Sequence, residues 1–187
     1  MYESPIPTVS DSWLKRYYYM RALVAGLWVA AAFTLGRGEP WIVGALLVAY
    51  PAWDALANFA DARQSGGLAR NPSQMFNVLV SGATAIAVAV ALGEGMNAVL
   101  GVFGVWAGLA GILQLATAVR RWKSVGAQWA MILSGAQSAL AGGFFLKQSF
   151  SAATPGITDI APYAAFGAFY FLVSAVLLTI SSRRRAG

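Results

Sequence analysis

The chain has 187 residues, of which 58% are hydrophobic and 11% are charged. Because a soluble domain carries charge on about a quarter of its residues, this composition excludes an ordinary water-soluble fold, and the absence of Cys and His excludes thiolate nucleophiles, Ser-His triads, the usual zinc sites and His-ligated haem. The net charge is +6, but the basic residues lie between apolar runs, which favours contact with membrane lipid over contact with nucleic acid.

Residues 1–16 are predicted to form a cytoplasmic and interfacial N-terminal segment. No basic region followed by an apolar stretch is present here, so a cleavable signal peptide is not expected. From Ser12 to Arg21 the sequence mixes aromatic and basic residues. This mixture is typical of an anchor at the membrane boundary that continues into the first span. A switch segment that binds lipid or a partner is the alternative.

Six segments have the roughly 20 apolar residues that a membrane-spanning helix needs. They lie at 17–36, 40–60, 75–92, 96–119, 125–146 and 160–180. Their length and continuous apolarity favour helices over barrel strands, which are about 10 residues long and alternate polar with apolar. The predicted fold class is all-α, a single membrane domain over 1–187 with six transmembrane helices.

The connections between the predicted spans are mostly short, which favours antiparallel hairpins. Residues 37–39 and 93–95 join the first two pairs of spans. Asn71-Pro72-Ser73-Gln74 has the pattern of a helix start, with a capping Asn, Pro at the first position and Gln at the third. The longest connection, 147–159, is expected to be a loop.

The basic residues predict the orientation. Of the 13 Lys and Arg residues, only Arg37 and Lys147 fall on one side of the predicted spans, and all the others fall on the opposite side. Since basic residues collect on the cytoplasmic side of membrane proteins, both termini are expected in the cytoplasm. An even number of spans agrees with this arrangement.

Short similarities recur along the chain and indicate an internal repeat. A pair of small residues lies early in every second predicted span, at 25–26, 81–82 and 134–135. In addition, residues 35–38 and 92–95 both read Leu-Gly-charge-Gly. The spans therefore form three tandem helical hairpins, each going out and back, with parallel rather than inverted repeat topology.

This three-hairpin plan, its small-residue openings and the segment 122–146 (WKSVGAQWAMILSGAQSALAGGFFL) resemble the HdeD-like membrane proteins, over nearly the whole chain. The function of that family is largely unknown, and its named member is associated with acid resistance at high cell density. The resemblance implies a multi-pass protein of the bacterial inner membrane and a role in stress. It carries over no catalytic residues.

Small residues also mark two of the predicted spans as sites of close helix packing. They are Gly101, Gly104, Gly108 and Gly111 in the fourth span and Gly135 and Gly143 in the fifth. Their spacing of three and four residues places them on one face of each helix, where small side chains let backbones approach closely in lipid. Packing within one molecule is one interpretation, and a seam between copies in a homo-oligomer is the other.

Asp54 is the acidic residue that lies within a predicted span. Asn58 follows one turn later on the same face, and Pro51 removes a backbone hydrogen bond just before them. One interpretation is a polar cavity open to the cytoplasm, in which Asp54 takes up protons or binds a cation. The other is that Asp54 reaches Asn58, water or a basic residue of the boundary and fixes helix packing.

Gln114 and Gln137 are the other amides within spans. Each has the capacity to hydrogen-bond between helices, for about 1 kcal/mol, or to bind a ligand. Together with Asp54 and Asn58 they make up the candidate polar site.

Two function hypotheses result, and neither includes an enzyme, a catalytic residue, a metal or a cofactor. The first is a non-enzymatic inner-membrane protein of stress or acid-resistance physiology that acts through packing or partners. The alternative is a small transporter or channel for protons, a cation or a small solute, with Asp54 as its ionisable group. A water-filled cavity that reaches Asp54 favours transport, and a closed bundle favours the first hypothesis.

Overall fold

A computed structural model of the chain describes residues 11–120 and 128–186. These residues form six long α-helices and one short 3-10 helix, without a strand. The helices are α1 (Asp11–Leu35), α2 (Pro40–Gln64), η1 (Leu68–Arg70), α3 (Pro72–Ala91), α4 (Met96–Arg120), α5 (Gln128–Ser149) and α6 (Ile157–Ala186). The all-α fold class is therefore confirmed. Predictions for 1–10, for Arg121 and Lys123, and for the start of the fifth span lie outside the described residues.

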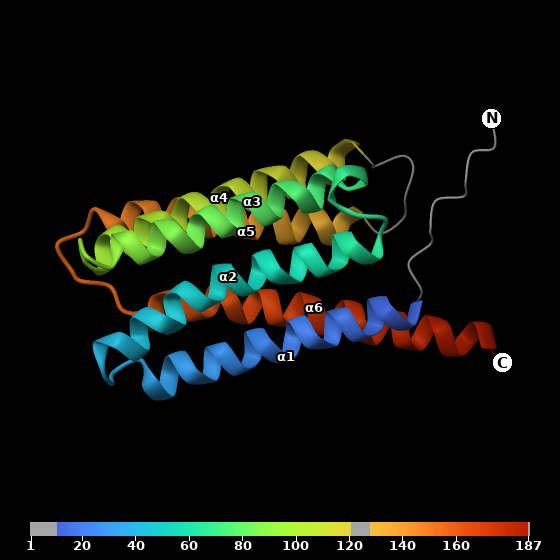
Figure 1. The fold of residues 1–187 in the computed structure, drawn as a ribbon, viewed down its shortest axis with the longest axis horizontal. Coiled ribbons are helices and arrows are strands. Elements are labelled where there is room, and N and C mark those ends of the chain that lie inside the picture. The colour runs from blue at the N-terminus through green and yellow to red at the C-terminus, as the bar shows by residue number, and fades with distance from the viewer. Residues whose placement is uncertain (1–10, 121–127, 187) are drawn as a thin grey trace.

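Successive helices run in opposite directions, so the start of α1 and the end of α6 lie at the same end of the bundle (Figure 1). Five of the described helices, all except α5, are long and apolar enough to cross a membrane by length and composition. A helix of 25 residues such as α1 or α2 is about 37 Å long, which exceeds a hydrocarbon core of about 30 Å.

The helices extend past the predicted spans. Helix α1 begins at Asp11, and α6 runs from Ile157 to Ala186, because helical hydrogen bonding continues into polar residues that a search for apolar runs leaves out. The loop predicted at 147–159 is correspondingly shorter and occupies 150–156. Asp159 lies in the first turn of α6, where its Oδ2 accepts a hydrogen bond from the Gly156 N–H at 2.6 Å.

The predicted capping of α3 was wrong in its details. Asn71 and Pro72 occupy the expected positions, but the Asn71 side chain makes no capping hydrogen bond. Its Nδ2 instead donates to the carbonyl oxygens of Ser65 and Gly67, at 2.8 Å each. Gln74 donates to Asp61 Oδ2 at 3.1 Å. Asn71 therefore bonds two carbonyls of the connection between α2 and α3, and Gln74 bonds the Asp61 carboxylate of α2.

The closest packing occurs between α4 and α5, between α1 and α6, and between α2 and α3, whereas α5 and α6 touch little. The tightest pairs are therefore not the pairs that form the predicted hairpins. Chain connection decides which helices follow each other, but side-chain size decides which backbones come close.

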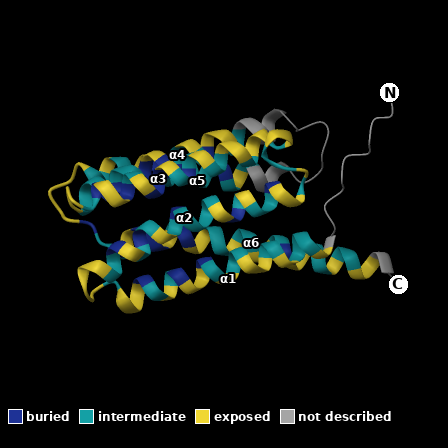
Figure 2. Cartoon of the chain, viewed as in Figure 1, coloured by how far each residue is buried: buried dark blue, intermediate teal, exposed yellow. Residues whose placement is uncertain are grey.

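The core is apolar and aromatic, and it includes Trp28, Leu47, Leu100 and Phe103. Buried positions lie on the inner sides of the helices, and exposed positions lie on the outer sides (Figure 2). Many large apolar side chains are exposed, among them Leu27, which is 60% exposed. An apolar outer surface of this extent is what lipid contact requires.

Glycines account for the approach of α4 to α5. A Cβ atom added at Gly111 would overlap the backbone of Ala139, and one added at Gly104 would lie 2.9 Å from the Leu146 backbone nitrogen. At Gly135 it would lie 3.0 Å from the Gly111 carbonyl oxygen. These three glycines therefore lie where the packing prediction placed them.

Other glycines of the predicted set behave differently. Gly101 has room for a Cβ, which would contact Ser149 at 3.5 Å, and a Cβ at Gly108 or Gly143 would meet no atom within 4 Å. Gly108 contributes only its backbone, which a Cβ at Gly142 would overlap. Gly143 is exposed, so it does not pack against another described helix of the same molecule, and Gly142 is the packing glycine of this turn.

Candidate functional site

Asp54 forms an ion pair with Arg21, which joins α2 to α1. Arg21 Nη2 donates to Asp54 Oδ1, and the two side chains are only 11% and 20% exposed. Asp54 lies 14 residues after Pro40, which is about 21 Å along α2, in the half of the helix nearer its C-terminal end. Two opposite charges that meet at this depth reduce the cost of placing either one in lipid.

The second carboxylate oxygen of Asp54 accepts two further hydrogen bonds. Ser81 Oγ of α3 donates to Oδ2 at 2.7 Å, and Asn58 Nδ2 donates to it at 3.0 Å. Trp106 Nε1 of α4 then donates to Ser81 Oγ at 3.1 Å. Asp54 is therefore the common acceptor of donors from three helices.

Arg21 is held by more than the carboxylate. Its Nη1 donates to the Tyr17 hydroxyl at 3.0 Å, and its guanidinium lies 4.2 Å from the centre of the Phe171 ring of α6. A cation over an aromatic face is stabilised by the ring quadrupole. The site, which we call the Arg21–Asp54 cluster, comprises Tyr17, Arg21, Asp54, Asn58, Ser81, Trp106 and Phe171, and it joins five helices.

Aromatic rings enclose the cluster on the side of the core. Trp28 and Tyr50 are 4.7 Å apart between ring centres, and Tyr50 meets Trp106 edge-on at 5.8 Å. Trp28 Nε1 donates to the Leu46 carbonyl at 2.7 Å, in the turn of α2 before Pro51. These rings make the surroundings of the ion pair less polar on this side, which strengthens the electrostatic attraction between the ion-pair partners.

A cavity of about 20 Å³ borders the ion pair and is lined by Arg21, Ala25, Tyr50, Trp53, Asp54 and Phe171. This volume is close to that of a single water molecule. It leaves no room for a hydrated cation or a small solute. Chemically, Asp54 is a carboxylate whose charge is neutralised by Arg21 and whose two oxygens both accept hydrogen bonds.

The four residues of the predicted polar site do not form a single site. Asp54 and Asn58 lie together. Gln137 of α5 accepts a hydrogen bond from the Tyr170 hydroxyl of α6 at 3.0 Å, and no interaction among the described residues connects it to Asp54. Gln114 is half-buried in α4. Gln137 thus makes an interhelical hydrogen bond.

Sequence reasoning offered a basic residue of the boundary as a partner of Asp54 but did not name Arg21, and it missed Ser81 and Trp106 as members of the cluster. Arg21 counted only as a basic residue of the boundary, and Ser81 counted only as part of a small-residue repeat. One signal was available for Arg21. It lies beyond three tyrosines and inside the first predicted span, where an arginine needs a partner.

Comparison with family models, with curated proteins and with solved structures finds no match. Among the described residues, no group of three or more acidic side chains is placed to hold a metal ion. The apolar helices of membrane-spanning length define the class of the protein, which is a multi-pass helical membrane protein.

Proposed function

We propose that the chain is a non-enzymatic protein of the bacterial inner membrane, with six spans in three tandem hairpins and both termini in the cytoplasm. In this proposal the Arg21–Asp54 cluster holds the bundle in one closed arrangement. A role in stress or acid-resistance physiology, exerted through packing or partners, comes from the resemblance to the HdeD-like proteins.

The observation that supports this proposal is that both carboxylate oxygens of Asp54 already accept hydrogen bonds within the protein. Its oxygens accept hydrogen bonds from Arg21, Ser81 and Asn58, and the adjoining cavity has about the volume of one water. A carboxylate that carries ions or protons needs an exchangeable partner and a path to water. A structural carboxylate needs fixed donors, as found here.

The alternative is a transporter or channel that uses Asp54, and the cavity is the observation in its favour. Asp54 borders that cavity together with Tyr50 and Arg21. Widening it by movement of α1 or α6 would hydrate the carboxylate. Transport would then require Asp54 to exchange Arg21 for a proton or cation during each cycle.

Flux into proteoliposomes separates the two functions. We expect the purified protein to give no proton or cation flux above protein-free vesicles, with or without a pH gradient. A flux that Asp54→Asn abolishes, while the variant keeps the wild-type elution profile in detergent, would replace the structural proposal with transport. Resistance to carbonate extraction from membranes tests the membrane placement separately.

A further inference from the structure

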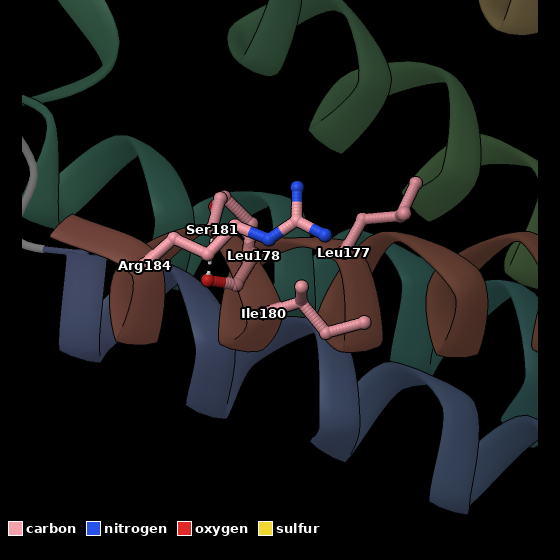
Figure 3. A pocket seen from close by; sticks show the side chains of 5 residues that line it. All are labelled: Leu177, Leu178, Ile180, Ser181 and Arg184. Atoms are coloured by element: carbon pink, nitrogen blue, oxygen red, sulfur yellow. Dashed lines mark hydrogen bonds between the residues drawn. The ribbon is translucent and has the colours of Figure 1, made fainter. Parts of the chain in front are cut away.

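A hollow of about 350 Å³ lies along the last turns of α6. Among the described residues it is lined by Leu177, Leu178, Ile180, Ser181 and Arg184. All five side chains extend from α6. The Arg184 side chain starts nearest the C-terminal end of the helix and turns back over the groove, so that its guanidinium lies toward Leu177 (Figure 3). The hollow is therefore a shallow, open groove on α6, with apolar walls and the Arg184 guanidinium lying over them.

The polar groups of the groove differ in their availability. Ser181 Oγ donates to the Leu178 carbonyl at 3.1 Å, so its proton is used within the helix. Arg184 is exposed, and no hydrogen bond or ion pair joins it to another residue in the described part of the chain. Its five N–H donors are therefore available to an anion.

We propose that this groove binds one anionic phospholipid, with an acyl chain against Leu177 and Ile180 and the phosphate on Arg184. The proposal rests on the placement of α6 in a membrane, as part of the proposed function. A planar guanidinium matches the paired oxygens of a phosphate. The backbones of Leu177 and Arg184 are seven positions apart, about 10 Å along the helix. In the bound state the Arg184 side chain turns toward the C-terminal end, where its charge meets the headgroup while Leu177 meets the chain.

Neighbouring charges favour an anionic over a zwitterionic lipid. Helix α1 packs closely against α6, and the start of α1 lies at the same end of the bundle as the end of α6 (Figure 1). Lys15 and Arg16 are close to that start. Basic residues at a membrane surface attract anionic lipid without selecting a position, so the groove supplies the position and the charges supply the preference.

Native mass spectrometry of the full chain in detergent tests the headgroup contact. Phosphatidylglycerol and phosphatidylcholine are added separately at equal concentrations, and bound lipid is counted. We expect the wild type to prefer phosphatidylglycerol, and Arg184→Gln to lower that affinity about tenfold, as for the loss of one charge-assisted contact. The matched control is Arg183→Gln, because Arg183 is exposed on the same helix but does not line the groove.

A second pair of variants tests the chain contact. Leu177→Trp fills the groove and is expected to lower the binding of both lipids. Leu172→Trp changes an exposed position of α6 outside the groove and is expected to bind like wild type. Circular dichroism and elution profile confirm that each variant is folded.

Equal losses for Arg184→Gln and Arg183→Gln would overturn the proposal, because a diffuse surface charge would then explain the preference. Unchanged binding by folded Leu177→Trp would overturn the groove as the chain site. If the wild type resists carbonate extraction but shows no lipid preference, the groove proposal alone is wrong. If carbonate extracts the wild type, the membrane placement is wrong as well.

Discussion

Asp54 shows how a charge becomes acceptable inside an apolar bundle. A lone carboxylate at the centre of a bilayer costs about 2.5–3.5 kcal/mol on insertion scales. Here Arg21 neutralises it, and Ser81 and Asn58 complete its hydrogen bonding. Removal of one member therefore leaves another member unpaired, which makes the cluster sensitive to single substitutions.

The first prediction concerns the ion pair itself. Asp54→Leu should lower the free energy of unfolding by about 3–5 kcal/mol, because it leaves Arg21 buried without a counter-charge. Asp54→Asn should also be destabilising, though less so because Asn keeps a hydrogen-bond acceptor. If Asp54 had no charged partner, Asp54→Asn would instead be expected to leave the stability unchanged. Thermal unfolding in detergent measures both effects.

The double variant Arg21→Met/Asp54→Leu is the control for this prediction. Replacing both partners with apolar side chains removes the unpaired charge, and such replacements are often neutral. We expect it to recover most of the stability that Asp54→Leu loses. Additive losses from the two single changes would show that the partners do not interact energetically.

Ser81 gives the second prediction, because it is the only described link between Trp106 and the carboxylate. Ser81→Ala should cost about 1–3 kcal/mol, since it leaves the buried Trp106 N–H without an acceptor. Thr84→Val is the matched control. Thr84 is buried in the same helix, but its hydroxyl donates only to the Val80 carbonyl. Equal melting temperatures for Ser81→Ala and the wild type would contradict the hydrogen-bond chain.

Asp54 and Asn58 of this site could be predicted from the sequence, but the residues that the other helices bring to them could not. Asp54 stands out as an acid within an apolar run, and Asn58 follows from helical spacing. Arg21 comes from a helix whose rotation and depth relative to α2 no local pattern specifies. Ser81 looks like any small residue at a helix interface until a carboxylate is placed beside it.

At the scale of the helices, α4 and α5 are joined by backbone proximity. Gly104, Gly111, Gly135 and Gly142 leave space that the partner backbone fills. Van der Waals contact between backbones is a main source of helix association in lipid, where apolar surface gains little from burial. This contact should therefore be sensitive to a single methyl group.

The third prediction compares two adjacent glycines. Gly142→Ala should destabilise the protein by about 1–3 kcal/mol, because its Cβ would overlap the Gly108 backbone and force the helices apart. Gly143→Ala adds the same methyl group where no atom lies within 4 Å. It should be neutral or slightly stabilising, since Ala favours helix. Thermal unfolding of the two variants provides the comparison, and equal shifts would contradict the α4–α5 packing.

The sequence predicts the stripe of small residues but not which of them are indispensable. Gly108 belongs to the stripe, yet a Cβ there would point into open space. Gly108→Leu should therefore be tolerated better than the spacing alone indicates, and Gly104→Leu should not. Whether a Cβ would meet the partner depends on the crossing of the two helices, which the spacing of small residues leaves undetermined.

For the whole molecule, hydropathy locates the helices because each apolar run must satisfy its own backbone hydrogen bonds in lipid. Hydropathy does not predict which pairs of helices pack most closely. The first helix, α1, packs closely against the last helix, α6. This pairing depends on how the side chains of the two helices fit together, which hydropathy does not report. The orientation of the bundle and the number of helices that cross the bilayer are testable together.

The last prediction concerns these two properties. The chain has no Cys, so each single-Cys variant carries one label site. Ala69→Cys lies between α2 and α3, Ser151→Cys lies between α5 and α6, and both positions are exposed. Three helices separate them, so the two sites lie on opposite sides of the membrane when α3, α4 and α5 all cross, and on the same side when α5 alone fails to cross.

We expect an impermeant maleimide to label Ala69→Cys in inverted vesicles and Ser151→Cys in intact spheroplasts, because the basic residues favour the cytoplasmic side for the first site. The reverse pattern would keep the six crossings and invert the orientation. Labelling of both variants from the cytoplasmic side would mean that α5 does not cross. The chain would then have an odd number of crossings, and its C-terminal end would lie outside, where Arg183 and Arg184 have no anionic cytoplasmic leaflet to contact.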